Sequence, residues 1–294
     1  MGIMGAAMAF NLLKAGHVLK VWNRSQSRPV LQELAAAGAV VESDLSACLK
    51  GAAVVFTCLG DENDVLDRLT GEADSVLSCL AAAQGRAIVV DFSTIGPATA
   101  RLIAAKLEAG GLSFLDAPVT GGDVGAKNAT LTIMVGGRED DFNQVLPLLQ
   151  SMGKNIRYCG AAGAGQALKL CNQVLCAVNM ISVCEAFTLA GDLELDPALV
   201  VDVLQTGAGG SWALANLGKR ILQDDLKPAF SLRNMLKDLR LVFDSLEKES
   251  DICAAHLPGT ALSASLFKQV ADESVEAPDS YGTQAMIRAY KSHF

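Results

Sequence analysis

The chain has 294 residues, a formal net charge of −8 at pH 7 and 51% hydrophobic residues. This length allows one large domain or two ordinary ones, and the composition predicts a sizeable buried core. The acidic balance, without a dense run of Lys or Arg, argues against a nucleic-acid partner. The eight cysteines contain no C-x-x-C pair, and the three histidines form no ligand cluster with them, so we expect no metal site.

The cysteine pattern and the N-terminus also bear on location. Scattered thiols without a disulfide spacing are typical of the reducing cytoplasm. The N-terminus has no charged region followed by an apolar stretch, so we expect no signal peptide. The most apolar segment, 174–191, is interrupted by Asn179, Ser182 and Glu185. We therefore predict a buried helix, not a membrane span, in a cytoplasmic protein.

The first half of the chain alternates helical and strand patterns. Residues 3–16 predict an amphipathic helix that ends at Gly16, and a short strand at 18–22 precedes a helix at 27–38. Near-continuous apolar runs predict buried strands at 53–59, 87–93, 113–119, 131–137 and 156–160. Helices are predicted between them at 62–83, 96–110 and 138–152. This alternation predicts an α/β fold with a doubly wound sheet.

After Gly165 the alternation stops and helical patterns follow one another. They cover residues 166–191, 197–206, 211–223, 231–249 and 259–274. We therefore predict two domains, an α/β domain at 1–160 and an all-α domain at 161–294. A helix as apolar as 174–191 should be buried from several sides, so a homodimer or homotetramer is expected.

The opening stretch, MGIMGAAMAF, contains a G-x-x-G at the start of the first predicted helix. This is the end of the dinucleotide-binding motif G-x-G-x-x-G, without its first glycine and preceding strand. In such a loop the residue that reads the adenosine ribose follows about 20 residues later, where this chain has Asn23, Arg24 and Ser25. An acid there would select NAD, whereas the guanidinium of Arg24 suits the 2′-phosphate of NADPH. A solvated surface arginine is the alternative.

Three further segments complete a pattern. They are DFSTIGP (91–97), DAPVTGGDVGAKNATLTIMVGG (116–137) and GAAGAGQALKLCNQVL (160–175). With the opening motif, they make the chain resemble the β-hydroxyacid dehydrogenase family, which includes 3-hydroxyisobutyrate dehydrogenase, tartronate semialdehyde reductase and the glyoxylate/succinic semialdehyde reductases. The resemblance extends over nearly the whole chain. It implies a Rossmann-type domain, an all-helical domain and hydride transfer between a nicotinamide cofactor and a small carboxylated substrate.

The resemblance also implies roles for individual residues in the Rossmann-type domain. It places cofactor contacts at Gly2, Met4, Gly5 and Thr94. It places the substrate carboxylate at Thr120, Gly121 and Gly122, where paired backbone N–H groups and a hydroxyl can hold an anion. The family commonly has Ser at position 120 and Gly at position 129, whereas this chain has Thr120 and Ala129.

The catalytic lysine of the family corresponds to Lys169. An ammonium group there would stabilise and protonate the substrate oxygen during reduction. Asn172 and Gln173 follow at i+3 and i+4 on the same helical face, in place of the Asn-Asn of many relatives. Residues 230–241 match F-x-L-x-x-x-x-K-D-L-x-L. This match implies that Lys237 approaches the cofactor and Asp238 joins the active-site network.

These observations predict an NADPH-dependent reductase of small carboxylated aldehydes such as glyoxylate or succinic semialdehyde, with NAD as a possible cofactor. An oxidative 3-hydroxyisobutyrate dehydrogenase, a tartronate semialdehyde reductase and a non-catalytic cofactor-binding scaffold remain alternatives. The absent strand would be internal to the sheet and would leave two neighbouring strand edges unpaired. We therefore expect either about ten further residues upstream of Met1 or a truncated form with a damaged cofactor site.

Overall fold

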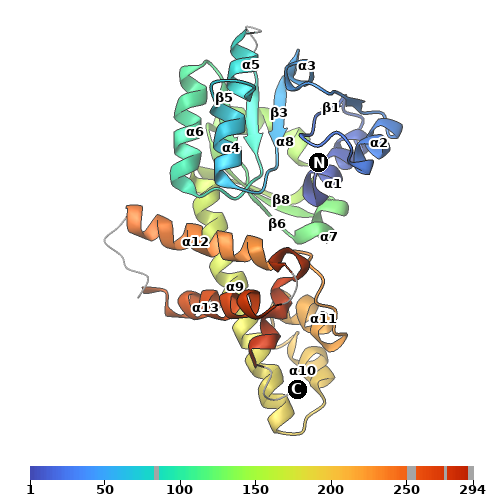
Figure 1. Ribbon diagram of the computed structural model, residues 1–294, viewed down its shortest axis with the longest axis vertical. Helices are drawn as coiled ribbons and strands as arrows, with labels where there is room; N and C mark the ends of the chain where they lie inside the picture. Colours follow the sequence, from blue (N-terminus) through green and yellow to red (C-terminus); the bar gives the residue numbers. More distant parts are fainter. Residues whose placement is uncertain (83–85, 250–255, 275–276, 291–294) are drawn as a thin grey trace. The chain divides into compact units, whose positions relative to one another are not determined.

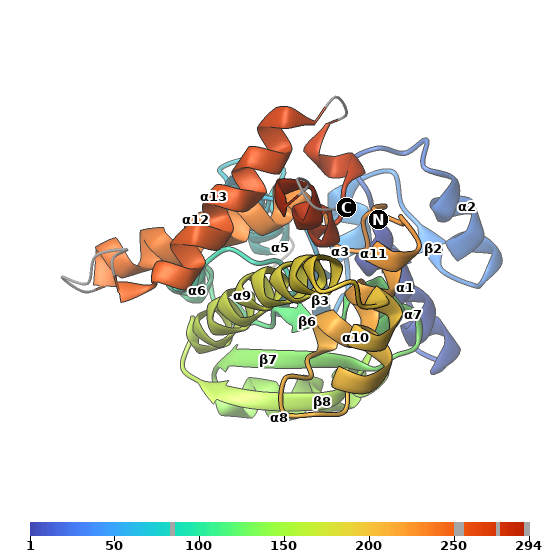
Figure 2. The same ribbon diagram turned by 90° about the horizontal axis from the view of Figure 1, so that it is seen from below.

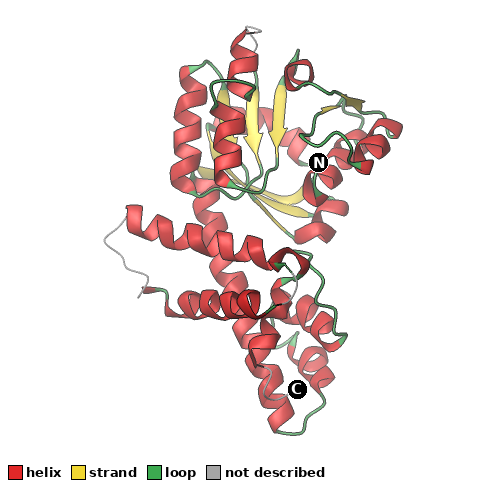
Figure 3. Cartoon of the chain, viewed as in Figure 1, coloured by secondary structure: helices red, strands yellow, loops and turns green. Residues whose placement is uncertain are grey.

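The computed structural model describes residues 1–82, 86–249, 256–274 and 277–290. It divides into two compact units, Met1–Lys169 and Leu170–Phe294. Figure 3 shows that strands occur in the first unit, whereas the described part of the second is helical. This confirms the predicted Rossmann-type α/β domain followed by an all-α domain.

The first unit alternates helices and strands along the chain (Figure 1). Its helices are α1 (Ile3–Lys14), α2 (Pro29–Ala36), α3 (Leu45–Leu49), α4 (Glu62–Thr70), α5 (Val76–Ala82), α6 (Pro97–Ala109), α7 (Gly122–Lys127) and α8 (Glu139–Leu149). Its strands are β1 (Lys20–Val21), β2 (Val40–Val41), β3 (Val54–Thr57), β4 (Ile88–Asp91), β5 (Ser113–Asp116), β6 (Val119–Thr120), β7 (Leu131–Gly137) and β8 (Gly153–Gly160).

Most of these strands form one mixed sheet in the order β3-β4-β5-β7-β6, with β8 also paired to β7. Strands β3, β4 and β5 are parallel, whereas β7 is antiparallel to β5 and β6. Neighbouring residues alternate between the faces, so that Val89 belongs to the apolar cluster with α3–α6 and Val90 to the cluster with α1, α7 and α8. The helices therefore cover both faces of the sheet.

Strands β1 and β2 form a separate two-stranded parallel sheet. They pack with α1 and α2 through a small apolar cluster that includes Val21, Leu31 and Leu34. Strand β3 pairs on one side with β4, and among the described strands none pairs with its other edge. The sheet is therefore interrupted between β1 and β3, as expected for a Rossmann-type sheet without an internal strand.

The second unit consists of helices around one apolar core. Its elements are α9 (Ala164–Asp192), which begins in the first unit, α10 (Pro197–Leu204), a π-helical turn (Ala213–Gly218), α11 (Lys219–Leu222), α12 (Leu232–Glu249), α13 (Pro258–Glu273) and two 3₁₀ helices (Pro278–Ser280 and Thr283–Tyr290). Figure 2 shows the long course of α9 clearly. Phe187 of α9 and Phe267 of α13 are fully buried in this core.

By length and composition alone, α9 could cross a membrane. Its residues Ala177, Met180, Cys184 and Phe187 instead form part of the core of the second unit. Gln173 of the same helix is buried and hydrogen bonds to a side chain of α12. These contacts are typical of a helix in the core of a domain.

The structure corrects several predicted elements. The single helix predicted at 62–83 is two helices, α4 and α5, because Gly71 ends the first and Asp74 adopts a positive φ of 50°; residue 83 lies outside the described residues. The strand predicted at 113–119 divides into β5 and β6 around Pro118, which has no backbone N–H to donate. The prediction also omitted short elements, namely β2, α3, α7 and the 3₁₀ helices near the C-terminus.

Candidate active site

Backbone N–H groups at the start of helix α9 bind the buried carboxylate of Asp116. Oδ1 of Asp116, the last residue of β5, accepts from the backbone N–H of Gly163 at 2.7 Å, and Oδ2 accepts from the backbone N–H of Gln166 at 2.9 Å. Burial raises the pKa of Asp116, while these backbone hydrogen bonds oppose the increase. A carboxylate at this position satisfies backbone donors of the first helical turn and interacts favourably with the positive end of the helix dipole.

Glycines allow the start of α9 to approach the sheet this closely. A Cβ on Gly165 would lie 2.3 Å from the carbonyl oxygen of Met134 and 2.9 Å from that of Asp116. A Cβ on Gly136 would lie 2.6 Å from Oδ1 of Asp116. The close packing of α9 on the sheet therefore requires small residues in GAAGAG, in addition to their match with the family motif.

The side chain of Gln166 joins α9 to the loop between β4 and α6. Its Oε1 accepts from the backbone N–H groups of Ile95 at 3.0 Å and Gly96 at 3.2 Å, and its Nε2 donates to the carbonyl oxygen of Ser93 at 2.8 Å. Thr94, a predicted cofactor contact, lies within this loop and is partly buried. The cap of α6 is Gly96, without a side-chain hydrogen bond. The Ser-Thr pair therefore does not act as the N-cap of that helix.

Lys169 lies one helical turn after Gln166 on α9, and the residue is only 6% exposed. An ammonium group is rarely buried to this extent unless other groups contact it. Its burial on the helix held by Asp116 distinguishes Lys169 from an ordinary solvated surface lysine.

The other predicted residues of α9 belong to a hydrogen-bonded network in the second unit. Gln173 donates from Nε2 to Oδ2 of Asp238 at 2.6 Å, and Asn172 donates from Nδ2 to Oε1 of Gln173 at 2.8 Å. Lys237 forms an ion pair with Asp238, with Nζ 3.1 Å from Oδ1. The structure therefore brings Asn172, Gln173, Lys237 and Asp238 together, although they come from two different helices.

The predicted carboxylate-binding residues form a turn between β6 and α7. Thr120 ends β6, and Gly121 and Gly122 have positive φ angles of 125° and 65°. Consecutive residues in such conformations can turn their backbone N–H groups toward one anion. Ala129, where the family usually has glycine, also adopts a positive φ, of 54°. This conformation is unfavourable for alanine.

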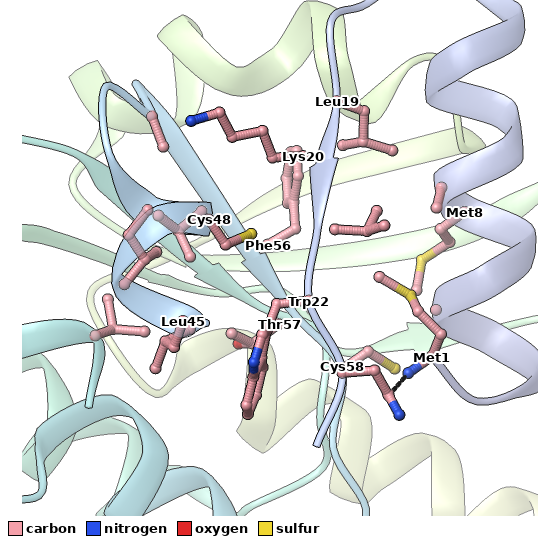
Figure 4. Close-up of a pocket in the computed structure, with 18 of the residues that line it drawn as sticks. Met1, Met8, Leu19, Lys20, Trp22, Leu45, Cys48, Phe56, Thr57 and Cys58 are labelled. Carbon is pink, nitrogen blue, oxygen red and sulfur yellow. Dashed lines mark hydrogen bonds between the residues drawn. The ribbon is translucent and has the colours of Figure 1, made fainter. Parts of the chain in front are cut away.

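The first unit contains a cavity of about 770 Å³ (Figure 4). Most of the predicted cofactor residues line it. Gly2 and Gly5 line it from α1, and Asn23, Arg24 and Ser25 line it from the loop after β1. Helix α1 has no side-chain cap at Gly2 and no acid in its first turn, and a Cβ on Gly2 would meet nothing within 4 Å. An open, uncapped helix N-terminus with nearby arginines fits the pyrophosphate and 2′-phosphate of a dinucleotide.

The same cavity extends between the two sheets. Lys20 and Val21 of β1 line it on one side and Val54–Thr57 of β3 on another, and Figure 4 shows Met1 and Met8 on the side of α1. The amino group of Met1 donates to Oδ1 of Asn23. Three predicted cofactor residues, Met4, Thr94 and Lys237, do not line this cavity. Met4 packs against the apolar cluster around β4 and β7.

Family comparisons identify the chain. Residues 1–160 match the NAD-binding domain of 6-phosphogluconate dehydrogenase, and residues 163–290 match the NAD-binding domain of NADP-dependent 3-hydroxyisobutyrate dehydrogenase. The chain belongs to the β-hydroxyacid dehydrogenase family. It is accordingly an NAD(P)-dependent oxidoreductase.

Individual members of the family are similar to this chain over almost its whole length. An uncharacterized oxidoreductase of Synechocystis sp. is 44% identical over 99% of this chain and 96% of the relative. The 2-hydroxy-3-oxopropionate reductase of Escherichia coli is 36% identical over 92% of this chain and 89% of the relative. The solved structure of Mycobacterium tuberculosis 3-hydroxyisobutyrate dehydrogenase with L-serine is 32% identical, covers 99% of this chain and 96% of that one, and superposes with a TM-score of 0.82.

These comparisons favour an enzyme over the non-catalytic scaffold that the sequence left open. Within residues 1–82, 86–249, 256–274 and 277–290, no group of three or more His, Cys, Asp or Glu side chains could hold a metal ion.

The motifs predicted no role for Asp116, Gln166 or Asp91. All three lie inside quoted motifs and are buried. Asp91 accepts from the hydroxyls of Thr57 and Ser93, both at 2.7 Å, and burial raises its pKa to about 6. Their polar character in apolar surroundings was the available signal. Except for Ser93, which is two residues from Asp91, their partners lie at least 34 residues away in sequence.

Proposed function

We propose that this chain is an NADPH-dependent reductase of small carboxylated aldehydes, with Lys169 as the proton donor. The observation that carries the proposal is the burial of Lys169 on a helix whose first turn is held by Asp116 and Gln166. A buried lysine held in this way has a fixed position, as a general acid requires.

The preference for NADPH is inferred from Arg24. Its guanidinium lines the cofactor cavity, its side chain is 77% exposed, and its ion pair with Asp64 is long, at 3.7 Å. An exposed pair of this kind contributes little free energy and is easily exchanged for a phosphate. Arg28 lines the same cavity and can assist.

The chemistry follows from what each residue can provide. The bound cofactor supplies a hydride to the carbonyl carbon of the aldehyde. Lys169 stabilises the negative charge that develops on the substrate oxygen and donates a proton to it. Gln173 and Asn172 follow Lys169 on α9 and orient the substrate, and Asp238 in turn holds the amide of Gln173.

The substrate class is inferred from Thr120, Gly121 and Gly122, whose backbone N–H groups and hydroxyl bind a carboxylate. Glyoxylate and succinic semialdehyde carry the required aldehyde and carboxylate. A second candidate is the interconversion catalysed by a 3-hydroxyisobutyrate dehydrogenase or a 2-hydroxy-3-oxopropionate reductase. Relatives with these names, 32% and 36% identical to this chain, favour it.

The test is to measure the oxidation of NADPH by purified wild type and by Lys169→Ala and Lys169→Arg, with glyoxylate, succinic semialdehyde, methylmalonate semialdehyde and tartronate semialdehyde. We expect Lys169→Ala to lower kcat by at least about 10²-fold with NADPH binding retained. Lys169→Arg should not restore activity, because guanidinium holds its proton too tightly.

Cys171→Ala is the matched control, since Cys171 is an exposed neighbour on the same helix. It should behave like wild type. A folded Lys169→Ala protein within threefold of wild-type kcat would refute the role of Lys169. The ranking of kcat/KM among the four aldehydes decides between the two substrate candidates.

We also propose that the second unit mediates self-association into a dimer or tetramer in the cytoplasm. Large apolar side chains are exposed on α9, α10 and the segments that follow them, namely Leu175, Leu189, Leu193, Leu195, Leu199, Val203 and Trp212. Exposed apolar surface of this extent is typical of a protein interface. The seven described cysteines are all free thiols, as in the cytoplasm, and Cys253 lies outside the described residues. Sedimentation analysis of the wild type and Leu189→Asp tests the association.

A further inference from the structure

The side-chain amide of Gln166 connects α9 to the loop between β4 and α6. The residue is fully buried. Its orientation is unambiguous, because the atom that faces the N–H groups of Ile95 and Gly96 must be the acceptor Oε1 and the atom that faces the carbonyl of Ser93 must be the donor Nε2. One side chain thus holds three consecutive peptide groups of the β4–α6 loop.

The loop is itself anchored to the sheet. The hydroxyl of Ser93 donates to Oδ1 of Asp91 at 2.7 Å and accepts from the backbone N–H of Leu59 at 2.8 Å. Gly96 adopts a positive φ of 76° directly before α6. The loop that contains Thr94 therefore has a fixed conformation, and Gln166 makes its connection to α9.

The helix is equally constrained on its side. The carboxylate of Asp116 binds the backbone of Gly163 and Gln166, and the lack of a side chain at Gly165 allows backbone contact with Met134 and Asp116. Lys169 is three residues after Gln166, so the two side chains project from the same face of α9. Loss of the hydrogen bonds that hold Gln166 therefore shifts the part of the α9 backbone from which the Lys169 side chain extends.

We infer that Gln166 is a positioning residue for Lys169, which sets the place of its ammonium group relative to the Thr94 loop. This inference rests on the proposed role of Lys169 as proton donor. A displacement of a catalytic group by about 1 Å can lower the rate about 10²-fold, so the loss of three hydrogen bonds at this point should be visible in kcat.

The first test compares Gln166→Met with the same substitution at Gln150, which is exposed at the end of α8. Methionine has a similar size but cannot form the three hydrogen bonds. We expect kcat of Gln166→Met to fall about 10- to 100-fold at a temperature well below its melting transition. The solvent isotope effect on kcat should increase, because proton donation becomes slower. Gln150→Met should match wild type in both quantities. A fall in melting temperature with unchanged kcat and isotope effect would show a merely structural role and overturn the inference.

The second test uses Gln166→Glu. A protonated glutamic acid has one acceptor and one donor and can reproduce the contacts with the loop, whereas its ionised form cannot donate to the carbonyl of Ser93. The titratable groups around this position are Asp116 and Asp91 at the sheet, Arg101 on α6 and Lys169 on α9. We expect the ratio of the variant kcat to the wild-type kcat to rise at least threefold as the pH falls from 8 to 6. A ratio that does not change with pH would contradict the inference.

A double-mutant cycle separates this inference from the proposed function. If Gln166 acts through Lys169, the double variant Gln166→Met/Lys169→Ala will be no slower than Lys169→Ala alone. Additive losses would overturn the positioning role while leaving Lys169 as the proton donor. Wild-type activity in folded Lys169→Ala would instead refute the proposed function, whatever Gln166→Met does.

Discussion

The two ends of the Rossmann-type sheet are built very differently. Where β4, β5 and β7 meet the start of α9, polar groups are buried and paired, and glycines allow backbones to touch. Where β1 and β2 lie apart from β3, a cavity of about 770 Å³ separates the strands, and Arg24 extends into solvent. The tightly packed region carries the proposed proton donor, and the open region carries most of the proposed cofactor contacts.

This difference indicates that proton donation and dinucleotide recognition need different kinds of local structure. Proton donation requires a group fixed within a fraction of an ångström, and in the proposed mechanism Asp116 and Gln166 of the packed region provide this for Lys169. Recognition of a dinucleotide relies on a helix N-terminus and long arginine side chains that adjust to the ligand. Substitutions should therefore be costly to folding in the packed region and should mainly alter binding in the open region.

The largest expected effect is that of Gly165→Ala. The new Cβ would lie 2.3 Å from a backbone carbonyl oxygen, which cannot move aside as a flexible side chain would. We expect a loss of about 3 kcal/mol or more in the free energy of unfolding, measured by urea denaturation. The matched control is Gly60→Ala in the open region, where a Cβ meets nothing within 4 Å. Equal stability losses in the two variants would contradict the contrast between the regions.

The next effect concerns cofactor selection in the open region. Arg24→Asp removes the guanidinium and places an acid where it can accept from a ribose hydroxyl. We expect the ratio of kcat/KM for NADPH to that for NADH to fall at least tenfold, or about 1.4 kcal/mol, without loss of stability. Asp64→Asn, which removes only the ion-pair partner of Arg24, should keep the wild-type preference. An unchanged ratio in Arg24→Asp would show that this residue does not read the 2′-phosphate.

A smaller effect is the pH dependence of stability in the packed region. Burial raises the pKa of Asp91 to about 6 from its ordinary value of 3.8. The folded state therefore binds more protons than the unfolded state between about pH 4 and 6, and stability decreases as the pH rises through this window. The unfolding free energy of the wild type should decrease as the pH is raised from 5.5 to 8. In Asp91→Asn this decrease should be smaller by about 1 kcal/mol.

The measurement for Asp91 is urea denaturation at both pH values, with Asp140→Asn as the control. Asp140 is exposed on α8, so that variant should follow the wild-type pH dependence. The raised pKa of Asp91 would be disproved by a wild-type pH dependence in Asp91→Asn.

The smallest effect is expected at Ala129. This residue has a φ of 54°, a conformation that glycine adopts without the steric cost paid by alanine. We expect Ala129→Gly to raise the free energy of unfolding by about 0.5–1 kcal/mol. Ala35→Gly, on the exposed side of the last turn of α2, should lower it by up to a similar amount. A loss of stability in both variants would argue against strain at Ala129.

The fold was largely predictable where apolar periodicity is long and uninterrupted. Strand β7 coincides with the predicted 131–137, and α9, α12 and α13 lie within two residues of their predicted ends. Short elements such as α3 and β2 give too few residues for a periodic pattern. The break between α4 and α5 depends on a turn in which Asp74 adopts a positive φ, and the local sequence does not specify this strongly.

The candidate site was predictable only through the family motifs. Lys169, Gln173 and Asp238 were named from them, and the structure adds the hydrogen bond that joins the last two. The partners of Asp116 and Gln166 were not predictable, because their contacts span 47 and 71 residues of sequence. Such contacts are determined by the packing of α9 on the sheet, and no local pattern encodes them.

The helix α9 is shared by both units, and this has a consequence for synthesis of the protein on the ribosome. The chain emerges from its N-terminus, so Asp116 is translated well before Gly163 and Gln166, whose backbone N–H groups it binds. The first unit can complete its hydrogen bonds only when the beginning of α9 has emerged. The remainder of the same helix contributes to the core of the second unit. Completion of the nucleotide-binding unit is therefore coupled in time to nucleation of the helical unit.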